Sequence, residues 1–416
     1  MNNVMNKKVC VIGIGYIGLP TAVILARAGY SVRGVDVKND VVETINKGVA
    51  HIIEPGLNNA LQRVVSEGRF TAFTEPAEAD IFIICVPTPL NMDEHSTDET
   101  LPRPNVSHVL RAVRTIAPIV RPGNYIILES TSPVGTTKKL AEALAEHSVS
   151  IDDLRIAYCP ERVIPGRAMI ELIENDRIVG GLTPEAAESC AEFYRSVVTG
   201  TILTTNAATA EMVKLSENSF RDVNIAFANE LSILAANMGV HVQEVIALAN
   251  RHPRVNILQP GPGVGGHCIA VDPWFLISQN PDSARLIQTA RQVNNDKTEW
   301  VIENIRAAAE KRSAELNRPP RIVLLGLTFK PNIDDLRESP ALKIAETLHR
   351  QNYRIYCVEP HITEHARLPL VSLTEGLKMA DIVVGLVKHS MFNHSTLSEH
   401  IDNNVGNSTF LNFAGL

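Results

Sequence analysis

The six cysteines of the chain are not equivalent. Five lie in runs that predict strands or helices, where a thiol serves as a small buried hydrophobe. Cys268 instead follows Gly265-Gly266-His267, in a turn too rich in glycine to form a core element. A thiol exposed beside the start of a helix can be held as the nucleophilic thiolate, and Asp272 is near enough in sequence to share its site. The pattern allows a catalytic cysteine and, equally, a purely structural turn.

A second set of polar residues shares one face of a predicted helix. Lys214, Asn218 and Arg221 occupy positions i, i+4 and i+7, a spacing that aligns side chains along one side of a helix. A lysine, an amide and an arginine together suit an oxyanion or a diphosphate. A solvated polar face shows the same pattern, so both interpretations stay open here.

Other candidate groups are weaker when they are taken alone. Glu161-Arg162 follows a predicted strand that ends near Cys159, and His252 and Arg254 flank Pro253 in a segment without clear periodicity. Each of these residues could equally lie on an ordinary polar surface. No second histidine or cysteine has metal-ligand spacing with His267, so we expect no metal.

A glycine-rich loop near the N-terminus predicts a dinucleotide site. Gly13, Gly15 and Gly18 form a G-x-G-x-x-G pattern between an apolar strand and the helix expected over 17–28. Such glycines let a pyrophosphate approach the backbone at the positive end of a helix. Asp36 ends the second strand, where a carboxylate binds ribose hydroxyls and repels a 2′-phosphate. The combination favours NAD over NADP, and a structural turn is the alternative.

Two further segments lie just past predicted strands. They are Val86-Pro87-Thr88-Pro89 and Ser130-Thr131-Ser132-Pro133-Val134-Gly135. Ligands of doubly wound sheets bind at the carboxyl edge, where such segments meet. Proline and glycine are also common in loops that have no binding role, and this explains each segment equally well.

The elements that would position these residues alternate between strand and helix. Strands are predicted at 8–12, 31–35, 81–86, 125–129, 155–158 and 177–179. Several are apolar without alternation, as in parallel strands covered on both faces. The proline-rich stretch 87–105 is expected to be a loop.

The second half of the chain predicts long helices and then a smaller α/β unit. Phe220, Val223, Phe227, Leu231 and Leu234 form one stripe of a helix ending near Met238. Another long helix is expected over 283–316, a Pro-Pro break follows, and strands are expected at 321–325, 354–358 and 381–386. The fold class is therefore α/β, with two Rossmann-like doubly wound domains joined by a central long-helix region. The expected domains are 1–205, which carries the NAD motif, 206–317, which is helical, and 318–416, which is the second α/β unit.

Composition excludes several functional classes. The 416 residues carry a formal charge of −7, which argues against nucleic acid, because its binders usually present a basic face. No apolar stretch approaches the ~20 residues of a membrane span, and the first eight residues lack the apolar core of a signal peptide. Sparse cysteines without a C-x-x-C pair are typical of a reducing cytoplasm.

The motifs recur in one order along nearly the whole chain. They are Gly13–Gly18, Asp36, Ser130–Gly135, Cys159–Val163, Glu211–Arg221, Gly263–Pro273, Phe329-Lys330 and Asp335–Ser339. Together they resemble the nucleotide-sugar dehydrogenases, the family that contains UDP-glucose 6-dehydrogenase and its N-acetylhexosamine relatives.

Within this family, two segments point to one branch. Residues 250–256 and 266–274 most resemble the branch that oxidises UDP-N-acetyl-D-mannosamine. The UDP-glucose branch usually has Pro-Lys where this chain has Ala270-Val271, and the UDP-N-acetylglucosamine branch commonly has proline at Ala270. Those two activities remain alternatives. A two-electron hydroxyacid dehydrogenase and a catalytically idle NAD/UDP-sugar sensor are alternatives of other kinds.

The resemblance implies an activity and a role for each motif. The C6 alcohol would be oxidised to a carboxylate with two NAD⁺, which supplies a uronic acid donor for surface polysaccharide synthesis. Implied catalytic residues are Cys268, Lys214, Asn218, Asp272 and Glu161. Implied NAD contacts are Gly13, Gly15, Tyr16, Ile17, Gly18, Asp36, Thr88, Thr131 and Arg337. Implied UDP-sugar contacts are Arg162, Val163, Lys214, Asn218, Arg221, His252, Arg254, Gly263, Phe329 and Lys330. The resemblance also implies that 1–205 binds NAD, that 206–317 is the catalytic and dimerisation region, and that 318–416 binds UDP. A homodimer is implied, with no nucleic-acid or membrane partner.

Overall fold

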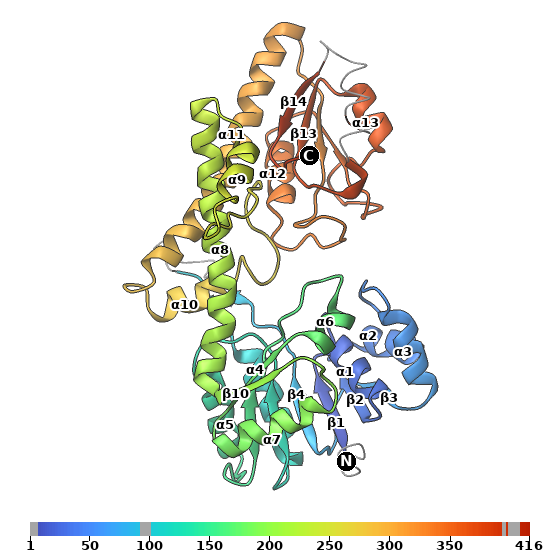
Figure 1. Ribbon diagram of the computed structural model, residues 1–416. Helices are drawn as coiled ribbons and strands as arrows, with labels where there is room; N and C mark the ends of the chain where they lie inside the picture. Colours follow the sequence, from blue (N-terminus) through green and yellow to red (C-terminus); the bar gives the residue numbers. More distant parts are fainter. Residues whose placement is uncertain (1–6, 92–100, 393–396, 398–407) are drawn as a thin grey trace. The chain divides into compact units, whose positions relative to one another are not determined.

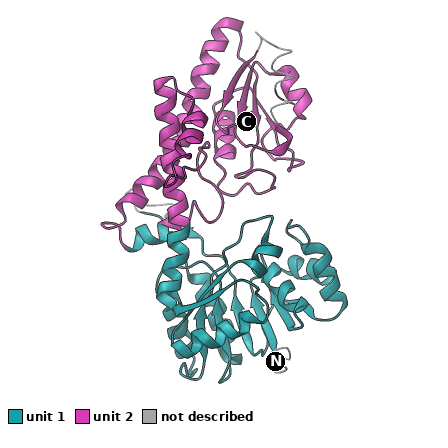
Figure 2. Ribbon diagram, viewed as in Figure 1, with its two compact units in different colours: residues 1–217, 274–279 teal, residues 218–273, 280–416 magenta. Residues whose placement is uncertain are grey.

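The computed structural model describes residues 7–91, 101–392, 397 and 408–416. Two compact units make up the fold, as the two colours of Figure 2 show: Met1–Glu217 with Trp274–Gln279, and Asn218–Pro273 with Asn280–Leu416. Each unit contains a sheet flanked by helices, and the long helices α8 (Ala207–Met238) and α11 (Arg285–Leu316) lie between the two sheets in the sequence (Figure 1). This confirms the predicted α/β class with two doubly wound sheets and a long-helix region.

The first unit is built on an eight-stranded sheet in the order β10-β9-β8-β7-β4-β1-β2-β3. Its strands are β1 (Lys8–Ile12), β2 (Ser31–Val35), β3 (Phe70–Phe73), β4 (Ile81–Ile84), β7 (Tyr125–Leu128), β8 (Arg155–Tyr158), β9 (Arg177–Gly181) and β10 (Ile202–Asn206). Its helices are α1 (Gly18–Arg27), α2 (Asn39–Asn46), α3 (Leu57–Ser66), α4 (Ser107–Ile116), α5 (Thr136–Ala145), α6 (Ala168–Glu174) and α7 (Pro184–Arg195). The strand order reverses between β1 and β4, and ligands of such sheets bind at the carboxyl ends of the strands that flank this point.

Two features of this unit differ from the prediction. Strand β9 pairs with β8 antiparallel, so the expectation of parallel strands throughout is wrong there. The antiparallel pairing is confined to Gly180 and Gly181 of β9, which lie opposite Tyr158 and Ala157. The predicted loop 87–105 contains a short antiparallel pair, β5 (Leu90–Asn91) with β6 (Arg103–Pro104), while its residues 92–100 lie outside the described residues.

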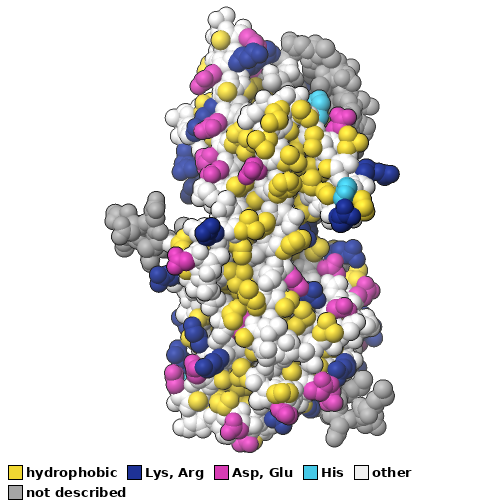
Figure 3. Space-filling view, turned by 60° about the vertical axis from the view of Figure 1, so that its left-hand side comes forward, with side chains coloured by type: hydrophobic (Ala, Val, Ile, Leu, Met, Phe, Trp, Pro, Cys, Tyr) yellow, Lys and Arg dark blue, Asp and Glu magenta, His cyan; other side chains and the backbone are white. Residues whose placement is uncertain are grey.

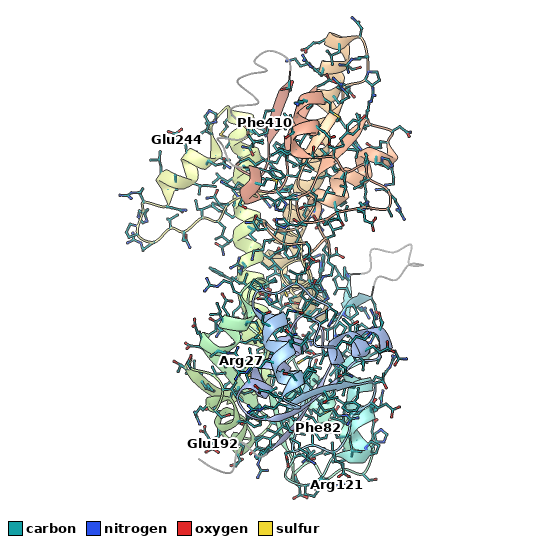
Figure 4. The ribbon with its side chains drawn as sticks, turned by 90° about the vertical axis from the view of Figure 1, so that its right-hand side faces the viewer. Arg27, Phe82, Arg121, Glu192, Glu244 and Phe410 are labelled. Atoms are coloured by element: carbon teal, nitrogen blue, oxygen red, sulfur yellow. The ribbon has the colours of Figure 1, made fainter. Side chains whose placement is uncertain are left out.

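Apolar strands of this sheet are covered on both faces. Val9 and Val11 of β1 enter one hydrophobic cluster, whereas Cys10 and Ile12 enter the other. The neighbouring β4 divides in the same way, and its Phe82 is labelled in Figure 4. Burial of alternate residues on opposite faces explains why the sequence shows continuous apolar runs rather than alternation.

The second unit carries a parallel four-stranded sheet in the order β12-β11-β13-β14. Its strands are β11 (Ile322–Leu325), β12 (Ile355–Val358), β13 (Ile382–Gly385) and β14 (Thr409–Asn412, with Phe410 labelled in Figure 4). Helices α9 (Val242–Ala249), α12 (Pro340–Arg350) and α13 (Leu373–Met379) also belong to this unit, and α10 (Pro273–Gln279) begins at its boundary with the first. Ser339 caps α12 by accepting a hydrogen bond from the Leu342 N–H.

Helix α8 packs against α11 through polar side chains. Asn229 donates to Asn294 at 2.9 Å, and Arg291 donates to Asp222 at 2.7 Å. Lys297 donates to Ser232 at 2.8 Å. This hydrogen-bonded face, rather than the predicted apolar stripe, joins α8 to the rest of its unit.

The predicted apolar stripe of α8 lies largely at the surface of the single chain. Phe220 is 70% exposed, Phe227 56% and Leu234 44%. Figure 3 shows hydrophobic side chains gathering on the helical side of the second unit. None of the described helices is long and apolar enough to cross a bilayer.

Candidate active site

Of the three glycines in the glycine loop, only Gly15 could carry a Cβ without a clash within the chain. Gly13 has φ +87°, and a Cβ there would meet the Cys85 carbonyl oxygen at 2.7 Å. A Cβ on Gly18 would overlap the Gly13 carbonyl. A Cβ on Gly15 would meet nothing within 4 Å, and its φ is not positive. The open space at Gly15, beside the start of α1, fits the pyrophosphate of NAD.

The other predicted NAD residues of the first unit lie at the carboxyl ends of strands. Asp36 follows β2, and its side chain accepts a hydrogen bond from the Lys38 N–H at 3.0 Å. Thr88, after β4, donates to the Thr131 carbonyl, after β7, at 2.6 Å, so the structure brings these two together. Tyr16 is exposed and Ile17 half-buried at the loop tip. A carboxylate at the end of β2 is able to accept hydrogen bonds from ribose hydroxyls.

Gly15 provides a direct test of the dinucleotide site. We expect Gly15→Val to leave the thermal midpoint unchanged, because its Cβ meets only open space, and to abolish detectable NAD⁺ binding by crowding the pyrophosphate. Calorimetric titration measures this affinity, and UDP binding by the same variant serves as the control. Wild-type NAD⁺ affinity in Gly15→Val would show that the dinucleotide binds elsewhere.

Glu161 and Lys214 form a buried ion pair in the first unit. The Lys214 ammonium donates to the Glu161 carbonyl at 2.8 Å and to its Oε1 at 3.0 Å. Glu161 Oε2 accepts the Val163 N–H at 2.9 Å, so both carboxylate oxygens are engaged. Because both side chains are almost fully buried, each charge depends on the other for compensation. The pair supplies a positioned cation and a positioned carboxylate.

Arg162, next to Glu161, forms an ion pair with a different residue of α8. Its guanidinium pairs with Glu217 of α8 at 2.6 Å and donates to the Asp176 carbonyl at 2.9 Å. The predicted substrate contact at Arg162 therefore shares its charge with two neighbours within the chain. Val163, next to it, is half-buried and packs on the hydrophobic core of the first unit.

The loop after β7 is held by the carboxylate of Glu211, for which no individual role was predicted. Glu211, at the start of α8, accepts hydrogen bonds from the Gly135 N–H, the Thr137 N–H and the Thr137 hydroxyl, at 2.6–2.7 Å. Burial raises the pKa of Glu211 above its usual range, although these hydrogen bonds act in the opposite direction. Glu211 thus joins the 130–135 segment to the helix that carries Lys214.

Cys268 and Asp272 belong to one tight turn of the second unit. The Cys268 carbonyl accepts the N–H groups of Val271 at 3.0 Å and Asp272 at 2.8 Å. The Asp272 carboxylate accepts a hydrogen bond from the Asn218 amide at 2.5 Å, and both side chains are buried. Cys268 is half-buried. The structure therefore places Cys268 and Asp272 in one turn through the Cys268 backbone, and it brings the Asp272 carboxylate to the Asn218 amide.

Phe329 lies against the glycines that precede Cys268. A Cβ on Gly265 would meet the Phe329 Cβ at 2.8 Å, and one on Gly266 would meet its ring at 2.7 Å. Gly266 also has φ +85°, and its N–H donates to the Arg337 carbonyl at 3.1 Å. Glycine is needed at these positions because the turn and the Phe329 loop approach each other closely.

Burial and neighbouring charges determine the protonation state of His267, which precedes Cys268. Burial, and next the charge of Arg337, lower the pKa of His267 below its usual range, although Asp335 and Glu338 act in the opposite direction. Arg337, a predicted NAD contact, pairs with Asp335 at 2.7 Å. Gly263 has φ +149°, and a side chain there would overlap Thr298 and Pro340. These features leave His267 neutral beside the cysteine.

Three predicted substrate residues are exposed at the surface of the single chain. Arg221 is exposed on α8. His252 and Arg254 are exposed in the segment after α9, where the Arg254 N–H donates to the His252 ring at 3.4 Å. Among the described residues, no three histidine, cysteine, aspartate or glutamate side chains gather to hold a metal ion.

One buried polar cluster, formed by Glu129, Arg177 and Cys85, was not predicted from the sequence. Glu129, at the end of β7, accepts hydrogen bonds from Arg177 at 3.1 Å and from the Cys85 thiol at 3.2 Å. Burial, and next the charge of Glu129, raise the pKa of Cys85 well above its usual range, so this thiol stays protonated. The cluster supports the glycine loop, because the Cys85 carbonyl lies directly against Gly13. A charged residue ending an apolar strand was the available signal, since a buried charge must be paired.

Comparisons with known proteins agree with this geometry. Three models of the UDP-glucose/GDP-mannose dehydrogenase family match the chain: the NAD binding domain at residues 7–198, the central domain at 208–296 and the UDP binding domain at 323–410. The first covers the glycine loop and the Glu161 segment, the second covers Lys214 and Cys268, and the third covers the Phe329 loop.

Individual relatives match over almost their full length. The chain is 50% identical over 406 residues to UDP-N-acetyl-D-mannosamine dehydrogenase of Escherichia coli K12, covering 92% of this chain and 94% of that one. It is 48% identical over 400 residues to NDP-N-acetyl-D-galactosaminuronic acid dehydrogenase of Ralstonia nicotianae, covering 93% and 92%.

A solved structure gives the same result for the fold. The chain superposes with a TM-score of 0.86 on the structure of a UDP-D-ManNAc dehydrogenase from Pyrococcus horikoshii, at 39% identity, covering 98% of this chain and 99% of that one. The predicted family and the predicted cofactor, NAD, are confirmed, and the UDP binding domain indicates a UDP-sugar substrate. The chain belongs to the UDP-glucose/GDP-mannose dehydrogenase family of NAD-dependent nucleotide-sugar dehydrogenases.

Proposed function

We propose that this chain oxidises UDP-N-acetyl-D-mannosamine at C6 to UDP-N-acetyl-D-mannosaminuronate. One alcohol, two NAD⁺ and one water give one carboxylate, two NADH and three protons. The observation that carries the proposal is the turn that holds Cys268 beside Asp272, whose carboxylate is bonded to Asn218. The relatives' names support the choice of sugar.

The first oxidation requires a base and a polarised alcohol. Asp272, fixed by Asn218 at 2.5 Å, takes the C6 hydroxyl proton directly or through a water that it orients. NAD⁺, held by the glycine loop and Asp36, would supply the hydride acceptor for this oxidation and for the second. The product is an aldehyde, which must be retained while the cofactor exchanges.

The second oxidation requires a covalent adduct. The Cys268 thiolate adds to the aldehyde carbon and gives a thiohemiacetal, which loses hydride to become a thioester. Water then attacks the thioester carbonyl and displaces the thiolate, assisted by Glu161 and Thr131. Lys214 and Asn218, four residues apart on α8, donate to the oxyanion of each tetrahedral species, at about 3–4 kcal/mol per well-placed donor.

Binding is divided along the sequence in this proposal. Residues 1–205 bind NAD through the glycine loop, Asp36, Thr88 and Thr131, with Arg337 contributing from the C-terminal part. Residues 206–317 supply catalytic groups and the dimer contact, and residues 318–416 bind UDP. The UDP-sugar contacts are Arg162, Val163, Lys214, Asn218, Arg221, His252, Arg254, Gly263, Phe329 and Lys330.

A homodimer is part of the proposal. The exposed stripe of Phe220, Phe227 and Leu234 repeats every seven residues on α8, and an apolar face of this kind is normally covered by a partner. We expect sedimentation to report twice the 45.5 kDa of one chain, and Phe227→Glu to favour the monomer. A monomeric wild type at micromolar concentration would contradict this assignment.

The cellular setting follows from the same reasoning. We place the enzyme in the cytoplasm, because its few, scattered cysteines suit a reducing compartment. Its product, a nucleotide-activated uronic acid, would serve as a donor for surface polysaccharide synthesis.

Turnover of four UDP-sugars side by side tests the assignment. NADH formation is measured with UDP-N-acetyl-D-mannosamine, UDP-N-acetylglucosamine, UDP-N-acetylgalactosamine and UDP-glucose at equal concentration. We expect the mannosamine sugar to give the highest kcat/KM. A higher value for another sugar would reassign the substrate, and no turnover with any of them would favour the idle sensor.

A further inference from the structure

A buried glutamate and histidine meet at the carboxyl ends of the C-terminal strands. Glu359 follows β12 and His389 lies beyond β13, and their side chains have no exposed surface. The His389 Nε2 and the Glu359 Oε2 are 3.1 Å apart. Neither residue takes part in the chemistry proposed above, although both lie beside the loop that carries Phe329 and Lys330.

The hydrogen bonds of His389 define its tautomer. Its Nδ1 lies 3.0 Å from the Asn332 N–H, which can only donate, so Nδ1 must be the acceptor. The ring hydrogen is therefore on Nε2 and is donated to Glu359. Burial raises the pKa of Glu359, but hydrogen bonds from His389 and from the Leu327 and His361 N–H groups outweigh it, so that the pKa lies below its usual range. The pair is a carboxylate bonded to a neutral imidazole.

This pair holds both ends of the Phe329 loop. Glu359 Oε2 accepts the Leu327 N–H at 2.7 Å and the Thr328 N–H at 3.2 Å, where the chain enters the loop. His389 accepts the Asn332 N–H, where the chain leaves it. Glu359 therefore anchors the entry and His389 Nδ1 anchors the exit, and the hydrogen bond between the two side chains leaves Nδ1 as the acceptor for Asn332.

The exit of the loop has one more anchor. Asn332 has φ +60°, and its side-chain oxygen accepts both the N–H and the hydroxyl of Ser390 at 3.0 Å. Residues 329–331 thus project from fixed points at Thr328 and Asn332. Phe329 in turn packs against Gly265 and Gly266, which precede Cys268.

We propose that Glu359 and His389 are positioning residues for the UDP site, which fix the Phe329–Lys330 loop and, through Phe329, the turn that carries Cys268. The proposal rests on the proposed function in one respect, the assignment of Phe329 and Lys330 to the nucleotide. Their action is indirect, because they set backbone positions and leave the nucleotide contacts to the loop.

Two substitutions separate the hydrogen bonds of His389. In His389→Asn the amide oxygen takes the place of Nδ1 and can still accept the Asn332 N–H, while the contact to Glu359 is lost. In His389→Gln the amide nitrogen takes the place of Nε2 and can still donate to Glu359, while Asn332 loses its acceptor. His389→Asn loses the Nε2 contacts to Glu359 at 3.1 Å and to the Thr328 hydroxyl at 3.3 Å, whereas His389→Gln loses only the acceptor for Asn332. A purely structural role therefore predicts a loss of UDP affinity in His389→Asn at least as large as in His389→Gln.

The experiment is calorimetric titration of the full chain with UDP alone. We expect His389→Gln to weaken UDP about tenfold, the equivalent of one buried hydrogen bond, and His389→Asn to remain within about threefold of wild type. The KM for the UDP-sugar should follow the UDP affinity, and NAD⁺ affinity should not change. Equal UDP affinities in the two variants, or a larger loss in His389→Asn, would overturn the proposal.

A variant at the surface keeps the test decisive if substitutions at His389 prevent folding. Asn332→Gly keeps the N–H and tolerates the positive φ, and removes only the anchor to Ser390. We expect it to weaken UDP several-fold with an unchanged thermal midpoint, and unchanged affinity would refute the anchoring of this loop. Because UDP is the probe, failure here is distinct from failure of the substrate assignment, which appears only in turnover of the UDP-sugars.

Discussion

Cys268→Ala should lower the rate of carboxylate formation on the order of 10⁴-fold or more, the scale of losses when a covalent nucleophile is removed. Alcohol oxidation needs only a base and a hydride acceptor, whereas aldehyde oxidation needs a tetrahedral adduct first. The variant should therefore stall at the aldehyde. The measurement is NADH formed and uronate formed under the same conditions. Uronate production near the wild-type rate would show that the glycine turn around Cys268 is only structural.

Cys268→Ser distinguishes loss of the nucleophile from loss of its leaving ability. Serine keeps a weak nucleophile of similar size, but an oxyester is hydrolysed less readily than a thioester. We expect a sugar adduct to accumulate on this variant and to be visible by intact mass. Cys190→Ala, which removes a buried thiol on α7, is the matched control and should keep wild-type turnover and show no adduct.

Lys214→Met is expected to have the next largest effect. Loss of one oxyanion donor should lower kcat by roughly 10²–10³-fold. The substitution also leaves the buried Glu161 carboxylate without its cation, which costs about 3–5 kcal/mol of folding stability. Both losses follow from one ammonium, which lies 2.8 Å from the Glu161 carbonyl and 3.0 Å from its carboxylate.

A double variant separates the two roles of Lys214. Glu161→Gln combined with Lys214→Met removes both charges, so we expect the thermal midpoint to recover most of its loss. Activity should stay low, because the oxyanion donor and the Glu161 carboxylate are both absent. Recovery of kcat along with stability would mean that Lys214 and Glu161 act only as a structural ion pair.

The elements of the fold were predictable where one local pattern determines them. Continuous apolar runs such as 81–84 belong to strands buried on both faces, and the 3–4 spacing of apolar residues marked α8. The glycine loop was predictable because G-x-G-x-x-G occurs there with a strand, a helix and Asp36. The antiparallel β8–β9 pair was not, because an apolar strand has the same composition whichever way it runs in the sheet.

The partners of buried charges could not be predicted, because they come from distant parts of the sequence. Glu129 meets Arg177, and Glu359 meets His389. Arg162 was expected to face the substrate, and the structure shows its ion pair with Glu217. Periodicity assigns a residue to a face of an element, but three-dimensional packing decides which charge compensates it.

The helical stripe shows a related limit of sequence patterns. Phe220, Phe227 and Leu234 have the spacing of a core-facing helix, yet they are exposed in the single chain. The face of α8 that packs on α11 is instead polar and hydrogen-bonded through Asp222 and Asn229. A hydrophobic period shows that a face is apolar and does not show whether the same chain or another one covers it.

The stoichiometry of the wild-type reaction tests the central claim most directly. A limiting amount of UDP-N-acetyl-D-mannosamine is converted with excess NAD⁺, and NADH is counted against sugar consumed. The covalent four-electron mechanism predicts two NADH for each sugar, with the uronate as the product and no free aldehyde. A ratio of one, with the aldehyde released as the final product, would contradict it.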